Sequence, residues 1–218
     1  MEKSIESIWK EGFLKSDALV APKLNNLYNQ KSKHIVDKFK KMFKINLILI
    51  VVWSFIVLIL SFVIGIPYMG VPMFFILNIL VILNKKLLST LTQIDKGMSS
   101  YDYLISFDGW LKDQVRVNKR FSRILYPSVF LTVILGFWMK EIDEVNAGDL
   151  IVSELLESYP NLYLINGVPG VIVLGVFVVL GLLVLAGGKI YEWDLKLVYG
   201  RVFRKLDEII ADIKELKG

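Results

Sequence analysis

The sequence contains no cysteine and a single histidine, His34. Without cysteine the chain has no disulfide, no thiolate metal site and no cysteine nucleophile. One histidine provides no imidazole cluster for a metal ion, and its lysine-rich surroundings favour a solvated surface position. The residues therefore predict a protein that carries no metal and no cofactor.

Catalytic motifs are missing as well. There is no HExxH helix, no GxSxG turn and no phosphate-binding loop ending in Lys-Ser or Lys-Thr. The acidic pairs Asp143-Glu144 and Asp207-Glu208 are adjacent in sequence, so on a helix their carboxylates would point apart rather than act together. We therefore expect a protein that is not an enzyme.

Ionisable residues are also absent from the interior of the four most apolar segments of the chain. A charged group inside a bilayer costs at least about 2.5–3.5 kcal/mol, so such residues are kept mainly for function. Their absence argues against proton- or ion-coupled transport and against a charge-lined pore.

Hydrophobic residues are abundant: they make up 55% of the 218 residues, while 22% are charged. The two kinds are separated into blocks, as is typical of a membrane protein with water-facing segments. We predict an all-α integral membrane protein with four transmembrane helices. These spans are residues 45–66, 67–84, 124–139 and 162–187.

Two local features of these spans carry further expectations. Pro67 and Pro72 with Gly70 predict a tight outer corner between the first two spans, because two prolines within six residues disfavour a continuous helix. Trp53 lies well inside the first span, so we expect it to pack between helices rather than in an interfacial belt.

Positive charge is distributed very unevenly. Residues 1–46 hold ten Lys and Arg, residues 84–123 hold eight and residues 188–218 hold seven, whereas residues 140–161 hold only Lys140 against six acids. Positively charged loops stay in the cytoplasm, so we expect both termini there and residues 140–161 as an acidic outer cap. The charge is then +10 inside and −5 outside, which explains the basic composition without nucleic acid.

The amino-terminal residues 1–44 predict cytoplasmic amphipathic helices. Ile5, Ile8, Trp9 and Phe13 recur at helical spacing, and Pro22 suits the first turn of a second, lysine-rich helix. The favoured interpretation of such a helix beside a span is that it lies on the membrane surface. The alternative is that it forms a binding surface for a partner protein.

Residues 85–123 predict a second cytoplasmic helical segment, broken near Gly97 and restarting at about Tyr101. Its later part has four basic residues on one face, which we expect to contact anionic lipid headgroups. A nucleic-acid role is weaker, because the face adjoins the bilayer and no recognition motif accompanies it. This face is Arg116, Lys119, Arg120 and Arg123.

The carboxy-terminal residues 188–218 contain the clearest periodicity in the chain. Apolar residues alternate four- and three-residue steps over about three heptads, which predicts a helix with one buried seam. The seam is either a self-association surface or packs on the 101–123 helix of the same chain. Its members are Leu195, Tyr199, Val202, Leu206, Ile209, Ile213 and Leu216.

Asn78 is the most notable polar residue at depth in a span. We expect an interhelical hydrogen bond from it, and the alternative is a ligand for a transported substrate. The glycines of the fourth span, which include Gly181, Gly187 and Gly188, are not spaced as GxxxG. Close helix contact through them is still open.

The opening stretch Ile5-Glu6-Ser7-Ile8-Trp9-Lys10, followed by a lysine-rich helix and a first span, resembles the start of small bacterial inner-membrane proteins of unknown function. The stretches 103–112 and 198–213 also resemble blocks of such proteins, and some of them are similar in layout to anti-sigma-like proteins. The resemblance implies a multi-pass protein of the bacterial inner membrane.

Two functional hypotheses follow. The leading one is a non-enzymatic regulatory or scaffolding protein whose cytoplasmic helices bind a protein partner or a second copy of the chain. The alternative is a transporter or channel component, in which oligomeric packing of helices forms the pathway.

Overall fold

A computed structural model describes the backbone of residues 5–217 and the side chains of residues 30–215. The protein is 84% helical, which confirms the all-α class. Four helices are long and apolar enough to cross a membrane, as expected for a multi-pass membrane protein. They are α1 (Ile5–Ile64), α2 (Pro67–Leu91), α3 (Ser100–Trp138) and α5 (Gly170–Lys217).

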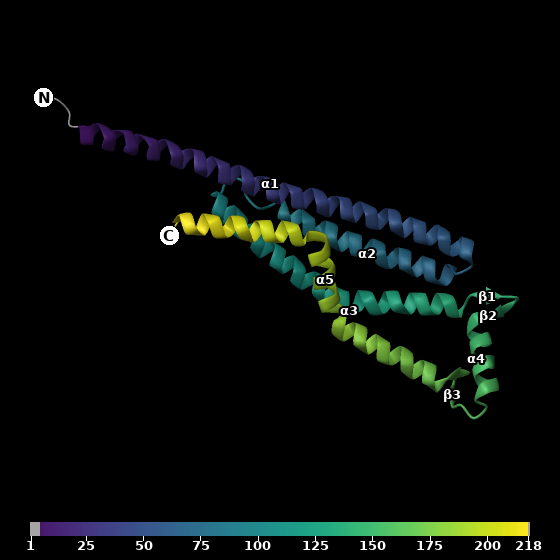
Figure 1. Ribbon diagram of the computed structural model, residues 1–218. Coiled ribbons are helices and arrows are strands. Elements are labelled where there is room, and N and C mark those ends of the chain that lie inside the picture. Colours follow the sequence, from purple (N-terminus) through teal and green to yellow (C-terminus); the bar gives the residue numbers. More distant parts are fainter. Residues whose placement is uncertain (1–4, 218) are drawn as a thin grey trace.

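Consecutive long helices run in opposite directions (Figure 1). Both chain termini lie at one end of the molecule, which we call the terminal end. The opposite end, here the hairpin end, carries the short helix α4 (Ala147–Ser158), which runs across from the end of α3 to the start of α5. This helix lies within residues 140–161, the segment expected to form the acidic outer cap.

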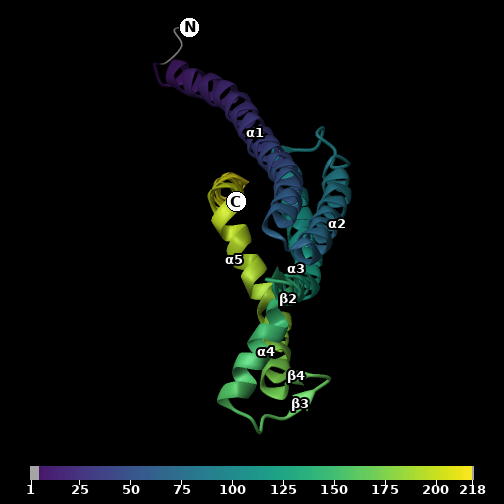
Figure 2. The ribbon, with the colours of Figure 1, turned by 90° about the vertical axis from the view of Figure 1, so that its right-hand side faces the viewer.

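Helix α1 is a single helix of 60 residues, whereas the sequence suggested two short helices before the first span. Pro22 lies within it and does not end it, because an internal proline removes one backbone hydrogen bond while the turns on either side persist. Its first part extends past the ends of all the other helices (Figures 1 and 2).

The turn between α1 and α2 lies two residues earlier than the predicted corner at Pro67–Pro72. The Ile66 amide donates to the Ser61 carbonyl at 2.7 Å and the Gly65 amide donates to Phe62 at 3.3 Å, with Gly65 at a φ of +79°. This is a Schellman motif, which needs a residue that tolerates positive φ. Pro67 then begins α2 and Pro72 lies inside it.

Two small hairpins frame α4 at the hairpin end. Strands β1 (Glu141–Ile142) and β2 (Val145–Asn146) pair through a turn at Asp143-Glu144, whose φ values are +51° and +68°. The acidic pair therefore forms the two-residue turn of a hairpin and does not lie on a helix.

The second hairpin corrects the fourth span. Strands β3 (Leu164–Ile165) and β4 (Val168–Pro169) pair through a turn at Asn166-Gly167, so α5 begins at Gly170 rather than at residue 162. Asn-Gly between apolar residues favours such a turn, because both residues accept positive φ.

The buried core lies at the terminal end. It joins α1 from Ile35 to Leu47, the last turn of α2, the first part of α3 and the carboxy-terminal part of α5, and we call this unit the terminal bundle. The spanning parts of the helices pack loosely by comparison. No residue from Val171 to Ala186 is buried, and Trp53 is 59% exposed, contrary to the expected packing between helices.

Figures 1 and 2 both show the spanning part of α5 lying apart from α1 and α2 before α5 bends into the terminal bundle. Most apolar side chains on this segment are exposed, and one side carries a half-buried row made of Ile172, Val176, Leu180 and Leu183. This pattern suits a helix that is largely surrounded by lipid. The buried residues of α5 begin at Gly187.

Candidate functional site

The predicted heptad seam of α5 is buried within its own chain. Five of its members are less than 8% exposed and Leu195 is half-buried, whereas the side chain of Leu216 lies outside the described residues. The seam packs on both α3 and α1, so the intramolecular alternative describes this structure. The five buried members are Tyr199, Val202, Leu206, Ile209 and Ile213.

An aromatic cluster forms the centre of the terminal bundle. Phe39 of α1 is 1% exposed, and five rings from α1, α3 and α5 lie 5.2 to 6.4 Å from its ring, centroid to centroid. Such pairs contribute about 0.5–1.5 kcal/mol each beyond their burial. The cluster therefore joins α1 to α3 and to α5. Its other members are Phe43, Phe107, Trp110, Tyr199 and Phe203.

A layer of amides lies where the terminal bundle meets the spanning segments. Asn118 of α3 donates to Asn84 of α2 at 3.1 Å, and Asn46 of α1 donates to the Tyr199 hydroxyl of α5 at 3.3 Å. Burial raises the pKa of Tyr191, beyond the fourth span, to about 12, and a hydrogen bond with Asn118 opposes this rise. The layer links all four long helices.

This amide layer was not predicted from the sequence. The sequence feature that could have revealed it is the position of three asparagines, each close to the end of an apolar segment: Asn46, Asn84 and Asn118. Each interhelical hydrogen bond contributes about 0.5–1.5 kcal/mol, and leaving one partner buried and unpaired costs more. The amides therefore restrict the helices to one register.

The basic face of α3 is only partly available to lipid. Lys119 lies 2.5 Å from Glu192 of α5, and Arg116 pairs with Asp113 at 3.0 Å on its own helix. The hydrogen bond from Lys119 holds the pKa of Glu192 below its usual value. Lys119 thus joins two helices, which the sequence did not indicate, whereas Arg120 and Arg123 are exposed.

Helices α3 and α5 approach each other closely at Gly187. A Cβ added there would lie 2.9 Å from the Ser122 carbonyl oxygen and 3.1 Å from the Arg123 Cα. Next to this contact, the Tyr126 hydroxyl donates to Asp194 at 2.6 Å. These contacts form a joint where the spanning part of α5 passes into the terminal bundle.

Asn78 makes the interhelical hydrogen bond expected of it. Its amide nitrogen donates to Ser54 of α1 at 3.1 Å and to the Phe74 carbonyl of its own helix at 2.8 Å. Both amide hydrogens are engaged, so this residue acts as a packing contact between α1 and α2.

Among the residues that the structure describes, no three His, Cys, Asp or Glu side chains gather in a way that could hold a metal ion. The arrangement is one of packed apolar and amide side chains with charged residues around it.

No protein-family model matches the chain, and comparisons with curated proteins and with solved structures also find no match.

The close approach at Gly187 predicts a clear difference between two glycine substitutions in α5. Gly187→Ala should lower the thermal unfolding midpoint measured by circular dichroism in detergent, because overpacking against backbone costs about 1–3 kcal/mol. Gly181→Ala is the control, since no atom lies within 4 Å of its added Cβ. Equal midpoints for the two variants would contradict the close contact between α3 and α5.

Proposed function

We propose that the protein is a non-enzymatic membrane regulatory or scaffolding protein. Its terminal bundle is the cytoplasmic unit, and the amino-terminal part of α1 binds a partner protein or a second copy of the chain. The observation that carries this proposal is that α1 continues past the bundle (Figure 1). Residues 5–29 correspond to about 37 Å of helix, which exceeds what the bundle needs.

The sequence of this projecting part is suited to recognition. Ile5, Ile8, Trp9 and Phe13 follow one another at helical spacing, so the helix has an apolar stripe. An amphipathic helix that extends from a folded unit binds by placing its apolar face in a groove of a partner or against another helix. Tryptophan and phenylalanine are well suited to anchor such a contact.

The carboxy-terminal seam has a different role in this proposal. Because Val202, Leu206 and Ile209 are at most 5% exposed, a partner helix could pack along the seam only by opening the bundle. The seam therefore supports the base of α1 and does not itself bind a protein partner. The transport alternative receives no such support, because Asn78 is engaged in packing between α1 and α2.

The proposed orientation has both termini in the cytoplasm and α4 outside, in a bacterial inner membrane. The charge distribution supports it, since residues 140–161 hold one of the 26 basic residues. Arg120 and Arg123 would then face anionic headgroups at the inner surface.

A cysteine-free chain makes this orientation easy to test. In intact cells, a membrane-impermeant maleimide should label Ser153→Cys on α4 and leave Ser89→Cys near the end of α2 unlabelled. The two serines are well matched, because each is exposed and donates to the carbonyl three residues earlier. Labelling of Ser89→Cys alone would mean that the chain is inserted the other way round.

Removal of residues 2–29 tests the binding role. The truncated chain should lose the cross-linked complexes that the full chain forms in native membranes, while its unfolding midpoint stays within a few degrees. The full-length variant with Ile8→Ser and Trp9→Ser should behave in the same way.

The control for this experiment is the full-length variant with Glu6→Ser and Lys10→Ser, which leaves both the apolar stripe and the net charge unchanged. Light scattering and mass spectrometry of the cross-linked material distinguish a second copy from another protein. Identical complexes from the full and truncated chains would rule out the proposed role of α1.

A further inference from the structure

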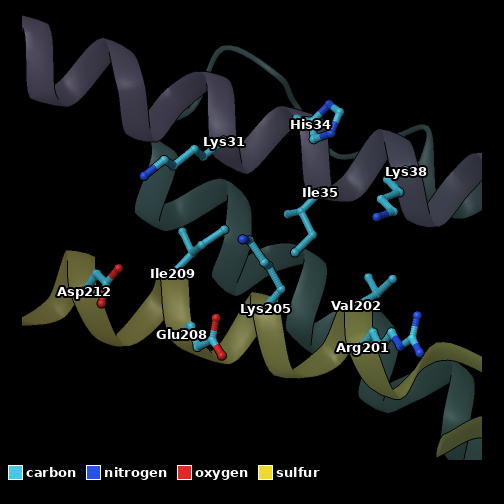
Figure 3. A pocket seen from close by; sticks show the side chains of 10 residues that line it. All are labelled: Lys31, His34, Ile35, Lys38, Arg201, Val202, Lys205, Glu208, Ile209 and Asp212. Atoms are coloured by element: carbon cyan, nitrogen blue, oxygen red, sulfur yellow. The ribbon is translucent and has the colours of Figure 1, made fainter.

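A groove of about 440 Å³ lies between α1 and α5 on the surface of the terminal bundle (Figure 3). Three apolar side chains that are themselves part of the buried core line it: Ile35 from α1, and Val202 and Ile209 from α5. The two helices thus provide an apolar base that is enclosed from both sides.

Four cations line the same groove from opposite helices. Lys31 and Lys38 come from α1, whereas Arg201 and Lys205 come from α5. Figure 3 shows Lys205 extending from α5 toward α1 and Lys38 extending toward α5. Within the part of the chain that the structure describes, Lys38, Arg201 and Lys205 form no ion pair.

This arrangement opposes the packing of the two helices. Like charges that face each other across a helix pair repel one another, and this repulsion offsets part of the energy gained by packing. The acids that line the groove, Glu208 and Asp212, come from the later turns of α5 and leave the end at Arg201 cationic. Features that reduce stability in this way are typical of binding sites.

The chemistry and the size of the groove together define a ligand class. Arginine and lysine side chains bind phosphate through charge-assisted hydrogen bonds, and arginine does so with two parallel donors. A volume of about 440 Å³ falls within the range of small-molecule sites. An apolar base beside the cations suits a ligand that joins a ring to its phosphates.

We propose that this groove binds a small soluble phosphate-bearing molecule of nucleotide size. Its phosphates lie against Lys38, Arg201 and Lys205, and its ring lies over Ile35, Val202 and Ile209. Such a ligand neutralises the facing cations and joins α1 to α5, so it stabilises the terminal bundle by mass action. This site does not depend on the proposed role of residues 5–29.

The test uses the full chain in phosphatidylcholine nanodiscs at about 0.15 M salt, where diffuse attraction is screened beyond about 8 Å. ATP and pyrophosphate are titrated by calorimetry, and the unfolding midpoint is measured with and without ATP. The expected result is saturable binding, a raised midpoint, and a Kd for ATP at least about tenfold weaker in Arg201→Gln and in Lys205→Gln.

Arg204→Gln is the matched control, because Arg204 is exposed on the same helix but does not line the groove. Its Kd for ATP should stay within about twofold of the unaltered chain. An equal loss in Arg204→Gln would show diffuse attraction, and the absence of binding by both ATP and pyrophosphate would also overturn the site.

A second set of nanodiscs, containing phosphatidylglycerol, distinguishes a soluble phosphate from a lipid headgroup. The Kd for ATP in these nanodiscs should stay within about threefold of its value in phosphatidylcholine nanodiscs. The opposite result has two parts: phosphatidylglycerol abolishes ATP binding, and Arg201→Gln but not Arg204→Gln weakens binding of the protein to phosphatidylglycerol vesicles. Together they would show that the groove binds a lipid headgroup, and the proposal of a soluble ligand would be overturned.

Discussion

Burial of the α5 seam against α1 and α3 is the interaction on which the rest of the structure depends. Leu206 is 1% exposed and Val202 is 4% exposed, and full burial of such side chains stabilises by about 1.5–3 kcal/mol each. The seam belongs to the last part of the chain, whereas Phe39 and its neighbours precede the first span. The packing of the seam on the residues that precede the first span therefore brings the terminal ends of all four long helices into one unit.

The spanning part of α5 shows why this closure matters. From Val171 to Ala186 it has no buried residue, and the buried residues of α5 begin at the joint at Gly187. Lys119 and Glu192 at that joint, together with the amide layer, fix how α3 and α5 cross.

Much of this fold could be predicted from the sequence, and the exceptions have physical reasons. Long apolar runs and the period of the seam predict helices directly, and Asn78 could be assigned because a lone amide in lipid needs a partner. The hairpin at Asn166-Gly167 was hidden by its apolar neighbours, which fit a span equally well. The Lys119–Glu192 pair and the groove join residues far apart in sequence, and helical periodicity does not reveal which faces meet.

The most direct test of the intramolecular bundle uses cysteines at positions 38 and 205, which are exposed and line one groove from α1 and from α5 in this cysteine-free chain. A single chain with both Lys38→Cys and Lys205→Cys should be joined within the monomer by a flexible bis-maleimide reagent, seen as faster migration on a denaturing gel. Co-expressed chains that carry one substitution each should form no cross-linked dimer. A cross-linked dimer from the co-expressed chains, with no link within the doubly substituted monomer, would show that the seam pairs between chains and would contradict the account.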